Sequence, residues 1–159
     1  MRLKRSWEGS AMTVKASIGK YSWIRVVDVM TKDPLTITPS DSVGQADELM
    51  WEDKIRQLPV VTGGELVGII TDRDIRSFLS SSLMVSPAAR GKALNTNVGD
   101  LMTTRLLTLS PDDDLQEAVE LFIEEKIGGV PVVDNAKGLV GIVTYVDLLR
   151  CFLNRLQED

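Results

Sequence analysis

The sequence predicts an α+β fold in which two βαββα units pack about a pseudo-twofold axis. The first observation is a repeat, because residues 28–61 match residues 100–133 with identical residues at many positions. The second is that both copies show the same order of apolar strand, amphipathic helix and Gly-containing turn. The third is size: a copy of roughly 50 residues cannot bury its own sheet, so the two copies should pack face to face.

Each copy begins with a short β-branched strand that a proline ends. These strands are expected at residues 35–38 and 106–109. A helix follows each strand, because apolar residues return at three-to-four spacing. In the first copy this apolar set is Val43, Ala46, Leu49 and Met50. The expected N-caps are Ser40 or Asp41 in the first copy and Ser110 or Asp112 in the second.

A β-hairpin and a second helix complete each copy. Residues 58–61 and 66–71 flank a Gly-containing turn, which the second copy replaces with residues 134–138. The strands are nearly continuous apolar runs, which is typical of strands buried on both faces. The closing helices are expected at residues 72–82 and 145–156.

The repeat also sets the expected domain boundaries. They are a basic extension at residues 1–22, a first unit at 23–82, a connector at 83–98 and a second unit at 99–159. The extension has a net charge of +4, leaving −9 for the rest of the chain. It lacks the apolar run of a signal peptide, so we interpret it as a loose extension or an added helix, with a mitochondrial-type address as the minor alternative. Residues 22–27 are apolar and β-prone, and predict an edge element.

Composition excludes several classes of function. The formal net charge of −5 makes nonspecific binding of nucleic acid unfavourable. The chain has no histidine, which removes the commonest acid–base group and metal ligand. Its single cysteine, Cys151, cannot form an internal disulfide, and no apolar run is long enough to span a membrane. We therefore expect a cytoplasmic protein that is not an enzyme.

The repeated motifs resemble the cystathionine-β-synthase (CBS) domain family. The first copy has DVMT at residues 28–31, TITP at 36–39, LPVV at 58–61 and GIITDRD at 68–74. The second copy has DLMT, TLSP, VPVV and GIVTYVD in the same order. The resemblance implies a paired module with up to two clefts for adenosine compounds such as AMP, ADP, ATP, S-adenosylmethionine or NAD. Such a compound would be a regulatory ligand and not a required cofactor.

The resemblance also implies which residues contact the ligand. It assigns the ribose to Asp74 with Thr71 and to Asp147 with Thr144, because a carboxylate accepts hydrogen bonds from both ribose hydroxyls. It places the adenine beside the first strand, and the pseudo-twofold joins the adenine wall of one copy to the Asp of the other. The implied ligand-binding residues are Thr36, Ile37, Pro39, Arg56, Thr71, Arg73, Asp74, Thr108, Leu109, Gly128, Thr144 and Asp147.

The two sites should not be equivalent, because the first helix opens with Asp72-Arg73 and the second with Tyr145-Val146. Arg73 or Arg76 would face a phosphate and Asp72 would repel it, and on balance the site with Thr71 and Asp74 should be slightly favoured. Each Thr–Asp pair is also a capping-box arrangement, which needs no ligand. Both roles stay open at this point.

The acidic run at residues 112–114 suits a hard cation, but its place at a helix start favours an ordinary role toward the helix dipole. Helical apolar residues are expected to form a homodimer contact. They include Phe78, Leu79, Leu148, Leu149 and Phe152.

Three classes of function follow. The first is a nucleotide-responsive regulator of an unidentified partner, and the second is a ligand-free dimerising scaffold. The third, an enzyme, is the weakest.

Overall fold

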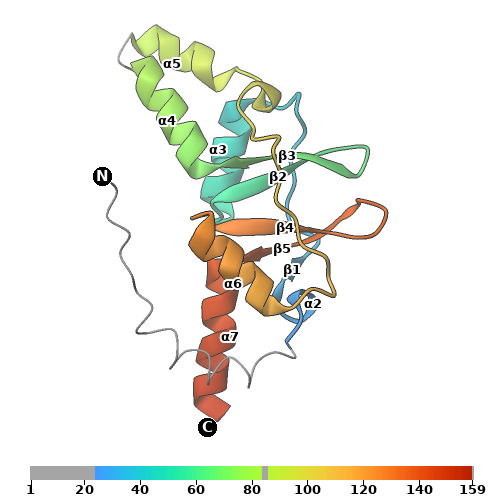
Figure 1. Cartoon of the computed structure of the whole chain (residues 1–159). Coiled ribbons are helices and arrows are strands. Elements are labelled where there is room, and N and C mark those ends of the chain that lie inside the picture. The colour runs from blue at the N-terminus through green and yellow to red at the C-terminus, as the bar shows by residue number, and fades with distance from the viewer. Residues whose placement is uncertain (1–23, 84–85, 159) are drawn as a thin grey trace, which may run out of the picture.

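The computed structural model describes residues 24–83 and 86–158 (Figure 1). The first unit occupies the upper half of Figure 1 and the second unit the lower half, with both hairpins directed to the same side. In chain order the elements are α2 (Val26–Val29), β1 (Thr31–Lys32), α3 (Val43–Glu52), β2 (Gln57–Thr62), β3 (Glu65–Thr71), α4 (Asp72–Leu83), α5 (Pro87–Leu94), the 3₁₀ turn η1 (Val98–Asp100), α6 (Leu115–Glu124), β4 (Gly129–Val133), β5 (Leu139–Thr144) and α7 (Tyr145–Glu158).

The two units exchange the short segments that precede them. β1 pairs antiparallel with β5 of the second unit, with Thr31 opposite Ile142. In return, Thr103 exchanges two backbone hydrogen bonds of 2.9 and 3.0 Å with Ile69 in β3. The reciprocal contacts relate the units by the expected pseudo-twofold and confirm the α+β class of paired βαββα repeats.

The two hairpins match in register as well as in sequence. β2 pairs with β3, and β4 pairs with β5, each with one irregularity between the last two valines of the first strand. The first turn uses Gly63 and Gly64 at positive φ, as two-residue hairpin turns require. The second turn is closed by Asp134, whose Oδ1 accepts from the amides of Ala136 and Gly138 at 2.9 and 2.8 Å.

The strands expected at residues 35–38 and 106–109 each shrink to a single parallel bridge. Ile37 donates to the carbonyl of Pro59 and accepts from Val61, at 3.1 and 2.9 Å, and Leu109 bonds the second hairpin in the same way. The chain then turns at once, because Asp41 N donates to Thr38 O. Pro39 and its counterpart in the second unit have no amide to extend the ladder, so the pairing stops.

The expected edge element at residues 22–27 is a helix start where the structure describes it. Arg25 forms one antiparallel bridge with Asp114, and α2 then begins at Val26. The first two residues of the expected element lie outside the described residues. The segment therefore reaches the second unit as expected, but not as a strand.

The first helix of each unit begins later than expected. The N-cap of α3 is Ser42, whose hydroxyl accepts from Gln45 N while the Gln45 side chain accepts from Ser42 N, a capping box. The N-cap of α6 is Asp114. The predicted cap Asp41 closes the preceding turn instead, because its Oδ2 accepts from Thr38 N at 2.7 Å. In the second unit the predicted cap Ser110 lies in the equivalent turn, where its N donates to Asp113 Oδ2 at 2.7 Å.

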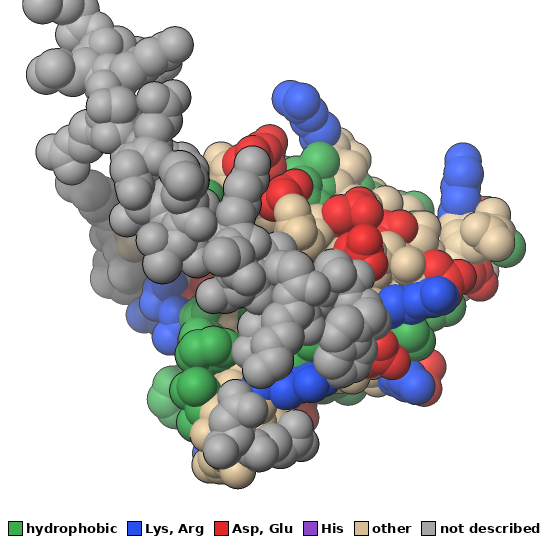
Figure 2. Space-filling model, turned by 60° about the horizontal axis from the view of Figure 1, so that its bottom comes forward, with side chains coloured by type: hydrophobic (Ala, Val, Ile, Leu, Met, Phe, Trp, Pro, Cys, Tyr) green, Lys and Arg blue, Asp and Glu red, His purple; other side chains and the backbone are tan. Residues whose placement is uncertain are grey.

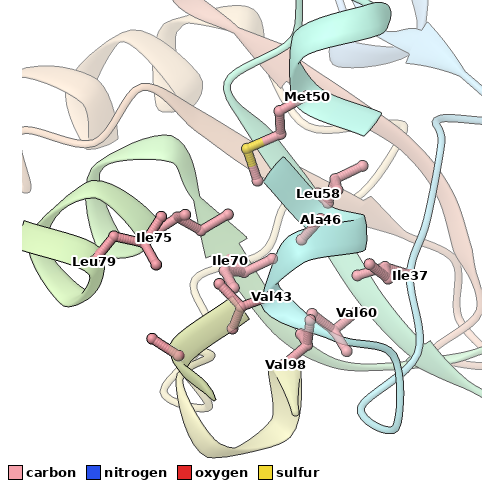
Figure 3. Close-up of a cluster of buried hydrophobic side chains, with 11 residues drawn as sticks. Ile37, Val43, Ala46, Met50, Leu58, Val60, Ile70, Ile75, Leu79 and Val98 are labelled. Atoms are coloured by element: carbon pink, nitrogen blue, oxygen red, sulfur yellow. The ribbon is translucent and has the colours of Figure 1, made fainter. Parts of the chain in front are cut away.

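The segment expected as a connector contributes to the first core. Within residues 83–98, Ser86 caps α5, which packs on α4 and α3. Ala93 of α5 and Leu79 of α4 belong to the same buried cluster as Ile70 and Val98. Figure 3 shows this cluster between β2, β3 and the covering helices. The second core is smaller and is built from Val26, Leu109, Ala118, Val130, Val132 and Val143.

Among the described residues no helix is long and apolar enough to cross a membrane. The acidic run at residues 112–114 forms local contacts: Asp112 pairs with Arg25 at 2.7 Å, and Asp113 closes the turn before α6. No cluster of three potential metal-ligating side chains is found in the part of the chain that the structure describes.

Candidate functional site

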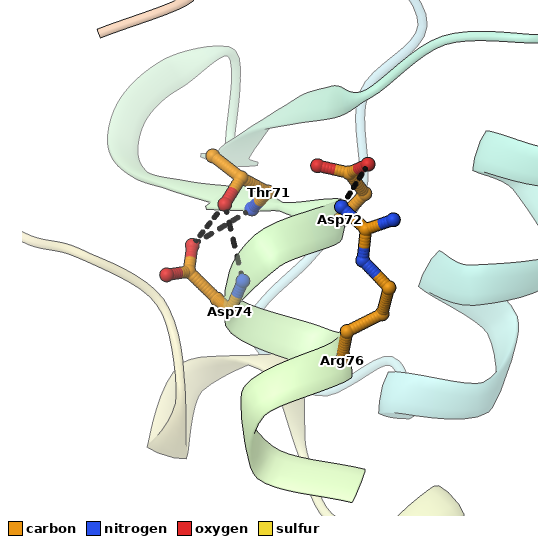
Figure 4. Close-up of polar contacts among 4 residues, drawn as sticks. All are labelled: Thr71, Asp72, Asp74 and Arg76. Carbon is orange, nitrogen blue, oxygen red and sulfur yellow. Dashed lines mark hydrogen bonds and ion pairs between the residues drawn. The ribbon is translucent and has the colours of Figure 1, made fainter. Parts of the chain in front are cut away.

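A Thr–Asp pair joins β3 to α4 in the first unit (Figure 4). Asp74 Oδ2 accepts hydrogen bonds from Thr71 N and from Thr71 Oγ1, at 3.0 and 2.6 Å. Asp74 N donates in turn to Thr71 Oγ1 at 3.2 Å. The pair is thus a complete capping box, which fixes both side chains where the strand ends.

The second unit repeats this arrangement between β5 and α7. Asp147 Oδ2 accepts from Thr144 N and Thr144 Oγ1 at 2.8 and 2.7 Å, and Asp147 N donates to Thr144 Oγ1 at 3.4 Å. Both carboxylates use Oδ2 for the cap. Within residues 24–83 and 86–158, Oδ1 of neither Asp has a hydrogen-bond partner. One acceptor oxygen of each pair therefore remains available.

Both pairs line one cleft of about 930 Å³ between the units. The exchanged segments explain why the cleft is shared. β1 pairs with β5, and Thr103 pairs with Ile69, so each exchanged segment reaches the hairpin of the other unit. Residues 33–35 and 105–107, which follow these segments, line the same cleft as both capping boxes. The volume lies within the range of small-molecule sites.

Seven of the twelve expected ligand-binding residues line this cleft, and five do not. The seven are Arg56, Thr71, Arg73, Asp74, Gly128, Thr144 and Asp147. Among the others, Ile37 and Leu109 are buried in the two cores, at 3% and 4% exposed. Thr36 and Thr108 are exposed outside the cleft, and Pro39 packs over Gly99.

The apolar wall of the cleft lies two residues before the expected position. Leu35 and Leu107 line it, and they are 46% and 37% exposed. Ile37 forms the single bridge to Val60 and is buried in the core, whereas Leu35 precedes that bridge and lines the cleft.

Charge is distributed unequally between the halves. The cleft is lined by six Lys and Arg side chains and five Asp side chains, whereas the whole chain has a net charge of −5. Asp33 and Arg105 are repeat counterparts that both line the cleft, and the pairing implied by the resemblance assigns Asp33 to the Asp147 half and Arg105 to the Asp74 half. Arg150 of α7 adds a cation to the Asp147 half, and Arg73 adds one to the Asp74 half. The half around Asp74 is therefore the more favourable site for an anionic group.

The expected repulsion by Asp72 is offset in the structure. Arg76 Nη2 lies 2.9 Å from Asp72 Oδ2, an (i, i+4) pair on α4 (Figure 4). Arg76 is thus directed to Asp72 and is not a lining residue of the cleft. Arg73 remains the cation of this helix that faces the cleft.

The middle of the cleft is asymmetric because one unit has a side chain where the other has none. Gln57 and Gly129 begin the equivalent strands β2 and β4. The Gln57 amide occupies the space that a Cβ on Gly129 would need. Arg56 and Gly128, which precede them, differ in the same way. The first unit therefore supplies the polar side chains at the centre.

Few of the first helical amides of α4 and α7 are available to a phosphate. Asp72 N already donates to Arg56 O at 2.9 Å, and Tyr145 N donates to Gly128 O at 3.3 Å. The amides of Asp74 and Asp147 bond the capping threonines. Two of the first three amides of each helix are therefore engaged, which leaves at most one of those three for a phosphate.

Sequence reasoning missed several cleft residues. They are Asp33, Pro34, Leu35, Lys54, Arg105, Leu106, Leu107, Lys126, Tyr145 and Arg150. One signal in the sequence was the repeat, which pairs Lys54 with Lys126. In the structure both lysines have a positive φ, of 54° and 55°. A non-glycine residue with this backbone in both copies marks a constrained corner next to the strand.

The architecture defines a class: two α+β repeats with exchanged edges and one shared polar cleft. The CBS domain family matches the chain over residues 26–81 and residues 98–154. The chain therefore belongs to the CBS domain family, in agreement with the resemblance of its motifs.

Relatives by sequence include proteins of different length. The protein MJ1225 of Methanocaldococcus jannaschii is 32% identical over 146 residues, which are 86% of this chain and 52% of that protein. The CBS domain-containing protein YhcV of Bacillus subtilis is 34% identical over 123 residues, 77% of this chain and 81% of YhcV. Inosine-5'-monophosphate dehydrogenase of Korarchaeum cryptofilum is 36% identical over 78% of this chain but only 23% of the enzyme. The chain thus spans about half of the first relative and about a quarter of that enzyme.

Solved structures share the paired arrangement. CBSX2, crystallised in complex with AMP, is 34% identical with a TM-score of 0.70, covering 82% of this chain and 96% of CBSX2. The CBS domain pair of MJ0100, in complex with 5'-methylthioadenosine and S-adenosyl-L-methionine, is 30% identical with a TM-score of 0.72. That match covers 83% of this chain and 98% of the pair. Both structures support the fold described above.

Proposed function

We propose that this chain is a non-catalytic regulatory module that binds an adenosine-containing ligand in the shared cleft and signals its presence to a partner protein. The observation that carries the proposal is the pair of fixed carboxylates. Asp74 and Asp147 each use one carboxylate oxygen in a capping box, and both residues line the same cleft. A ribose has two adjacent hydroxyl donors, which match the remaining oxygen of such a carboxylate.

The rest of the cleft suits the other parts of such a ligand. Leu35 and Leu107 offer apolar faces on which a purine ring packs. Arg73 and Arg105 offer cations to a phosphate or to a carboxylate. The complexes of CBSX2 with AMP and of the MJ0100 pair with 5'-methylthioadenosine and S-adenosyl-L-methionine support this class of ligand.

Signalling follows from the position of the cleft between the units. A ligand held by a loop of one unit and the capping box of the other stabilises one relative arrangement of the two. It shifts the population only by its difference in affinity between arrangements. The partner would recognise the favoured arrangement. Its affinity for the module, measured with and without ligand, should therefore differ, and equal affinities would exclude this mechanism.

The first experiment is a melting-temperature screen of the full chain with AMP, ADP, ATP, S-adenosylmethionine, 5'-methylthioadenosine and NAD. A ligand at about 100 times its Kd stabilises the folded state by about 2.7 kcal/mol. One or more of these compounds should raise the melting temperature, and GTP at the same concentration serves as the comparison. If none of the adenosine compounds raises it, ligand binding is excluded and the dimerising scaffold becomes the better hypothesis.

Replacing the ribose acceptor tests the site itself. Asp74→Asn should weaken binding in its half of the cleft by about 10- to 100-fold, because a hydrogen bond to a charged group is lost. Asp147→Asn should do the same in the other half. Asp41→Asn and Asp113→Asn are matched controls, because these carboxylates also close local turns but lie outside the cleft. Calorimetric titration should show weaker ligand binding in Asp74→Asn and Asp147→Asn and unchanged binding in Asp41→Asn and Asp113→Asn.

The non-catalytic part of the proposal has its own measurement. Each adenosine compound that binds should be recovered unchanged by chromatography after prolonged incubation with the protein. Reproducible conversion that disappears in Asp74→Asn would show that the chain is an enzyme.

The homodimer expected from the sequence stays a prediction, and the structure narrows the surface available to it. Of the five apolar residues named for it, Leu149 and Phe152 are exposed, while Leu79 is buried at 7% exposed. Leu148 and Phe78 pack against the cores. A helical dimer contact would therefore use the second unit more than the first.

A further inference from the structure

We propose that the shared cleft extends past Asp147 into a polar pocket between α2 and α7, and that this pocket selects an adenosine ligand whose 5' substituent ends in an α-amino acid. The pocket has a volume of about 420 Å³. The adenosine part of such a ligand would be held in the cleft, so the inference rests on the proposed function. The pocket adds a preference among adenosine compounds.

The pocket adjoins the cleft at three residues. Thr31, Asp147 and Arg150 line both of them. Thr31 is held there because it pairs with Ile142 of β5, and α2, which precedes it, contacts α7. Asp147 uses Oδ2 in its capping box, which leaves Oδ1 as the proposed acceptor for a ribose. A ligand whose ribose is bound by Asp147 therefore lies where the cleft meets the pocket.

The second unit has small residues at this place where the first unit has large ones. Phe78 on α4 and Leu101 both pack against the first core. Their repeat counterparts are Cys151 on α7 and Val29 on α2, and both of these smaller residues line the pocket. Space that an aromatic ring and a leucine fill in the first unit is thus open in the second.

The side chains around this space are also more polar than their counterparts. Arg150 and Asn154 line the pocket, and the equivalent positions of α4 hold Ser77 and Ser81. Within the described ranges, no ion pair and no side-chain hydrogen bond involves Arg150. Its guanidinium therefore has donors for a ligand, in the planar arrangement that suits a carboxylate.

The charges of the pocket favour a zwitterion over a chain of phosphates. Arg150 and Arg155 line it together with two carboxylates, those of Asp28 and Asp147. Figure 2 brings the end of the second unit forward, and this face carries both acidic and basic side chains. An α-amino acid brings one carboxylate and one ammonium group, which side chains of opposite sign can bind separately. Further phosphates would instead add negative charge beside Asp28 and Asp147.

The pocket and the predicted dimer contact lie on different sides of α7. Asp147, Cys151 and Asn154 line the pocket and follow one another at three-to-four spacing, so they share one side of the helix. The exposed Leu149 and Phe152 fall on the opposite side. A dimer formed through Leu149 and Phe152 would therefore leave the pocket accessible.

The test compares S-adenosylhomocysteine with 5'-methylthioadenosine on the full chain. Both compounds are adenosine thioethers without a permanent charge on sulfur, and only the first has an amino-acid end. S-adenosylhomocysteine should bind about 10- to 100-fold more tightly, because hydrogen bonds to charged groups are gained. Calorimetric titration measures both affinities, with AMP and ATP as the phosphate-bearing comparison.

Two substitutions that restore the residues of the first unit test the pocket. Cys151→Phe should fill it, and Arg150→Ser should remove the proposed carboxylate donor, so each should abolish most of the preference for S-adenosylhomocysteine over 5'-methylthioadenosine. Arg150→Ser serves if Cys151→Phe does not fold. Arg90→Ser is the matched control, because Arg90 is exposed on α5 and lines neither the cleft nor the pocket.

The thiol of Cys151 gives a second readout, since the chain has a single cysteine. Each compound is added at about ten times its own Kd, so that the cleft is equally occupied in both samples. S-adenosylhomocysteine should slow the reaction of the thiol with an aromatic disulfide reagent by about tenfold, because only the unoccupied fraction reacts. 5'-Methylthioadenosine should slow it much less, because it does not reach the pocket.

The outcomes separate this inference from the proposed function. Equal affinities and equal thiol protection by the two thioethers would overturn the pocket and leave adenosine binding intact. Tighter binding of ATP than of AMP, with a gain that Cys151→Phe removes, would show a phosphate-binding extension and overturn the selection of an amino acid. If neither thioether nor AMP binds, the proposed function and this inference both fail.

Discussion

The hairpin of the first unit and the hairpin of the second share their register, their single irregularity and the capping box that follows them. The loops that face those capping boxes share much less. Asp33 stands where the other unit has Arg105, and Arg56 stands where the other has Gly128. Positions that hold backbone geometry are therefore matched between the units, while positions that meet the cleft differ. Equivalent substitutions at the backbone positions should therefore lower the free energy of unfolding equally in both units. Equivalent substitutions at the cleft positions should change ligand binding unequally.

The largest effect is expected at the two glycines beneath the exchanged segments. A Cβ on Gly141 would lie 2.5 Å from Met30 Sδ, and a Cβ on Gly68 would collide with Met102 Sδ. Gly68→Ala and Gly141→Ala should each lower the free energy of unfolding by about 1–3 kcal/mol, because the methionine is displaced from a packed contact. Urea unfolding of both variants measures this. A large difference between them would contradict the equivalence of the units.

A double-variant cycle identifies the contact responsible. In a Met102→Ala background the cost of Gly68→Ala should nearly vanish, and in a Met30→Ala background it should persist. If Met102→Ala and Met30→Ala reduce the cost of Gly68→Ala equally, the lost free energy of unfolding does not come from the contact between Gly68 and Met102.

Replacing the capping threonines should lower the free energy of unfolding by somewhat less than the glycine substitutions do. Thr71→Val and Thr144→Val remove the hydroxyl that bonds the Asp and accepts from its amide, so each should lower the free energy of unfolding by about 1 kcal/mol. Thermal unfolding without ligand compares the two. Thr38→Val is a control, because its hydroxyl contacts Asp41 on an exposed turn. Thr38→Val should lower the free energy of unfolding by less than Thr71→Val or Thr144→Val.

The charged loop positions should separate the two halves of the cleft. Arg105→Gln should weaken AMP binding in the Asp74 half by about three- to tenfold, because a nearby opposite charge is lost. Asp33→Asn should strengthen AMP binding in the Asp147 half by a similar factor. Asparagine tolerates the φ of 48° found at Asp33, so the backbone should be retained.

Adenosine provides the control for these two substitutions. It has no phosphate, so neither Arg105→Gln nor Asp33→Asn should change its affinity in calorimetric titration. A change of equal size for adenosine and AMP would show that the residues act through the shape of the cleft and not through charge.

The smallest effect is expected at the centre. Gly129→Ala should push the Gln57 amide aside and change ligand affinity in both halves by about twofold. In a Gln57→Ala background the same substitution should have no effect. Unequal changes in the two halves would place Gln57 in one half-site alone.

The repeat, the hairpins, the closing helices and both capping boxes could be predicted because each depends on residues close together in sequence. Thr71 and Asp74, for example, are three positions apart, and their bonds follow from the strand-to-helix junction. The α+β class and the family membership follow from the same local patterns. These features needed no knowledge of how the two units meet.

The wall of the cleft could not be predicted in the same way. Leu35 and Arg105 line the cleft between the units because the segments before them, β1 and Thr103, pair with the hairpins of the opposite unit. The strand expected after Leu35 is only a single bridge at Ile37, and the side chain of Ile37 is buried in the core. The role of α5 was missed for a related reason, since its apolar residues are few and its burial depends on contact with α4.

The exchanged edges also govern the order in which the protein can be completed during synthesis. The outer edge of β3 is paired by Thr103, a residue that the ribosome adds 32 positions after Thr71. Until that residue has emerged, the first hairpin presents an open backbone edge, which is prone to pair with other chains. The second hairpin has no such delay, because β1 is made long before β5 and waits for it. Nascent chains stalled before Met102 should therefore need protection that chains stalled after Thr144 do not.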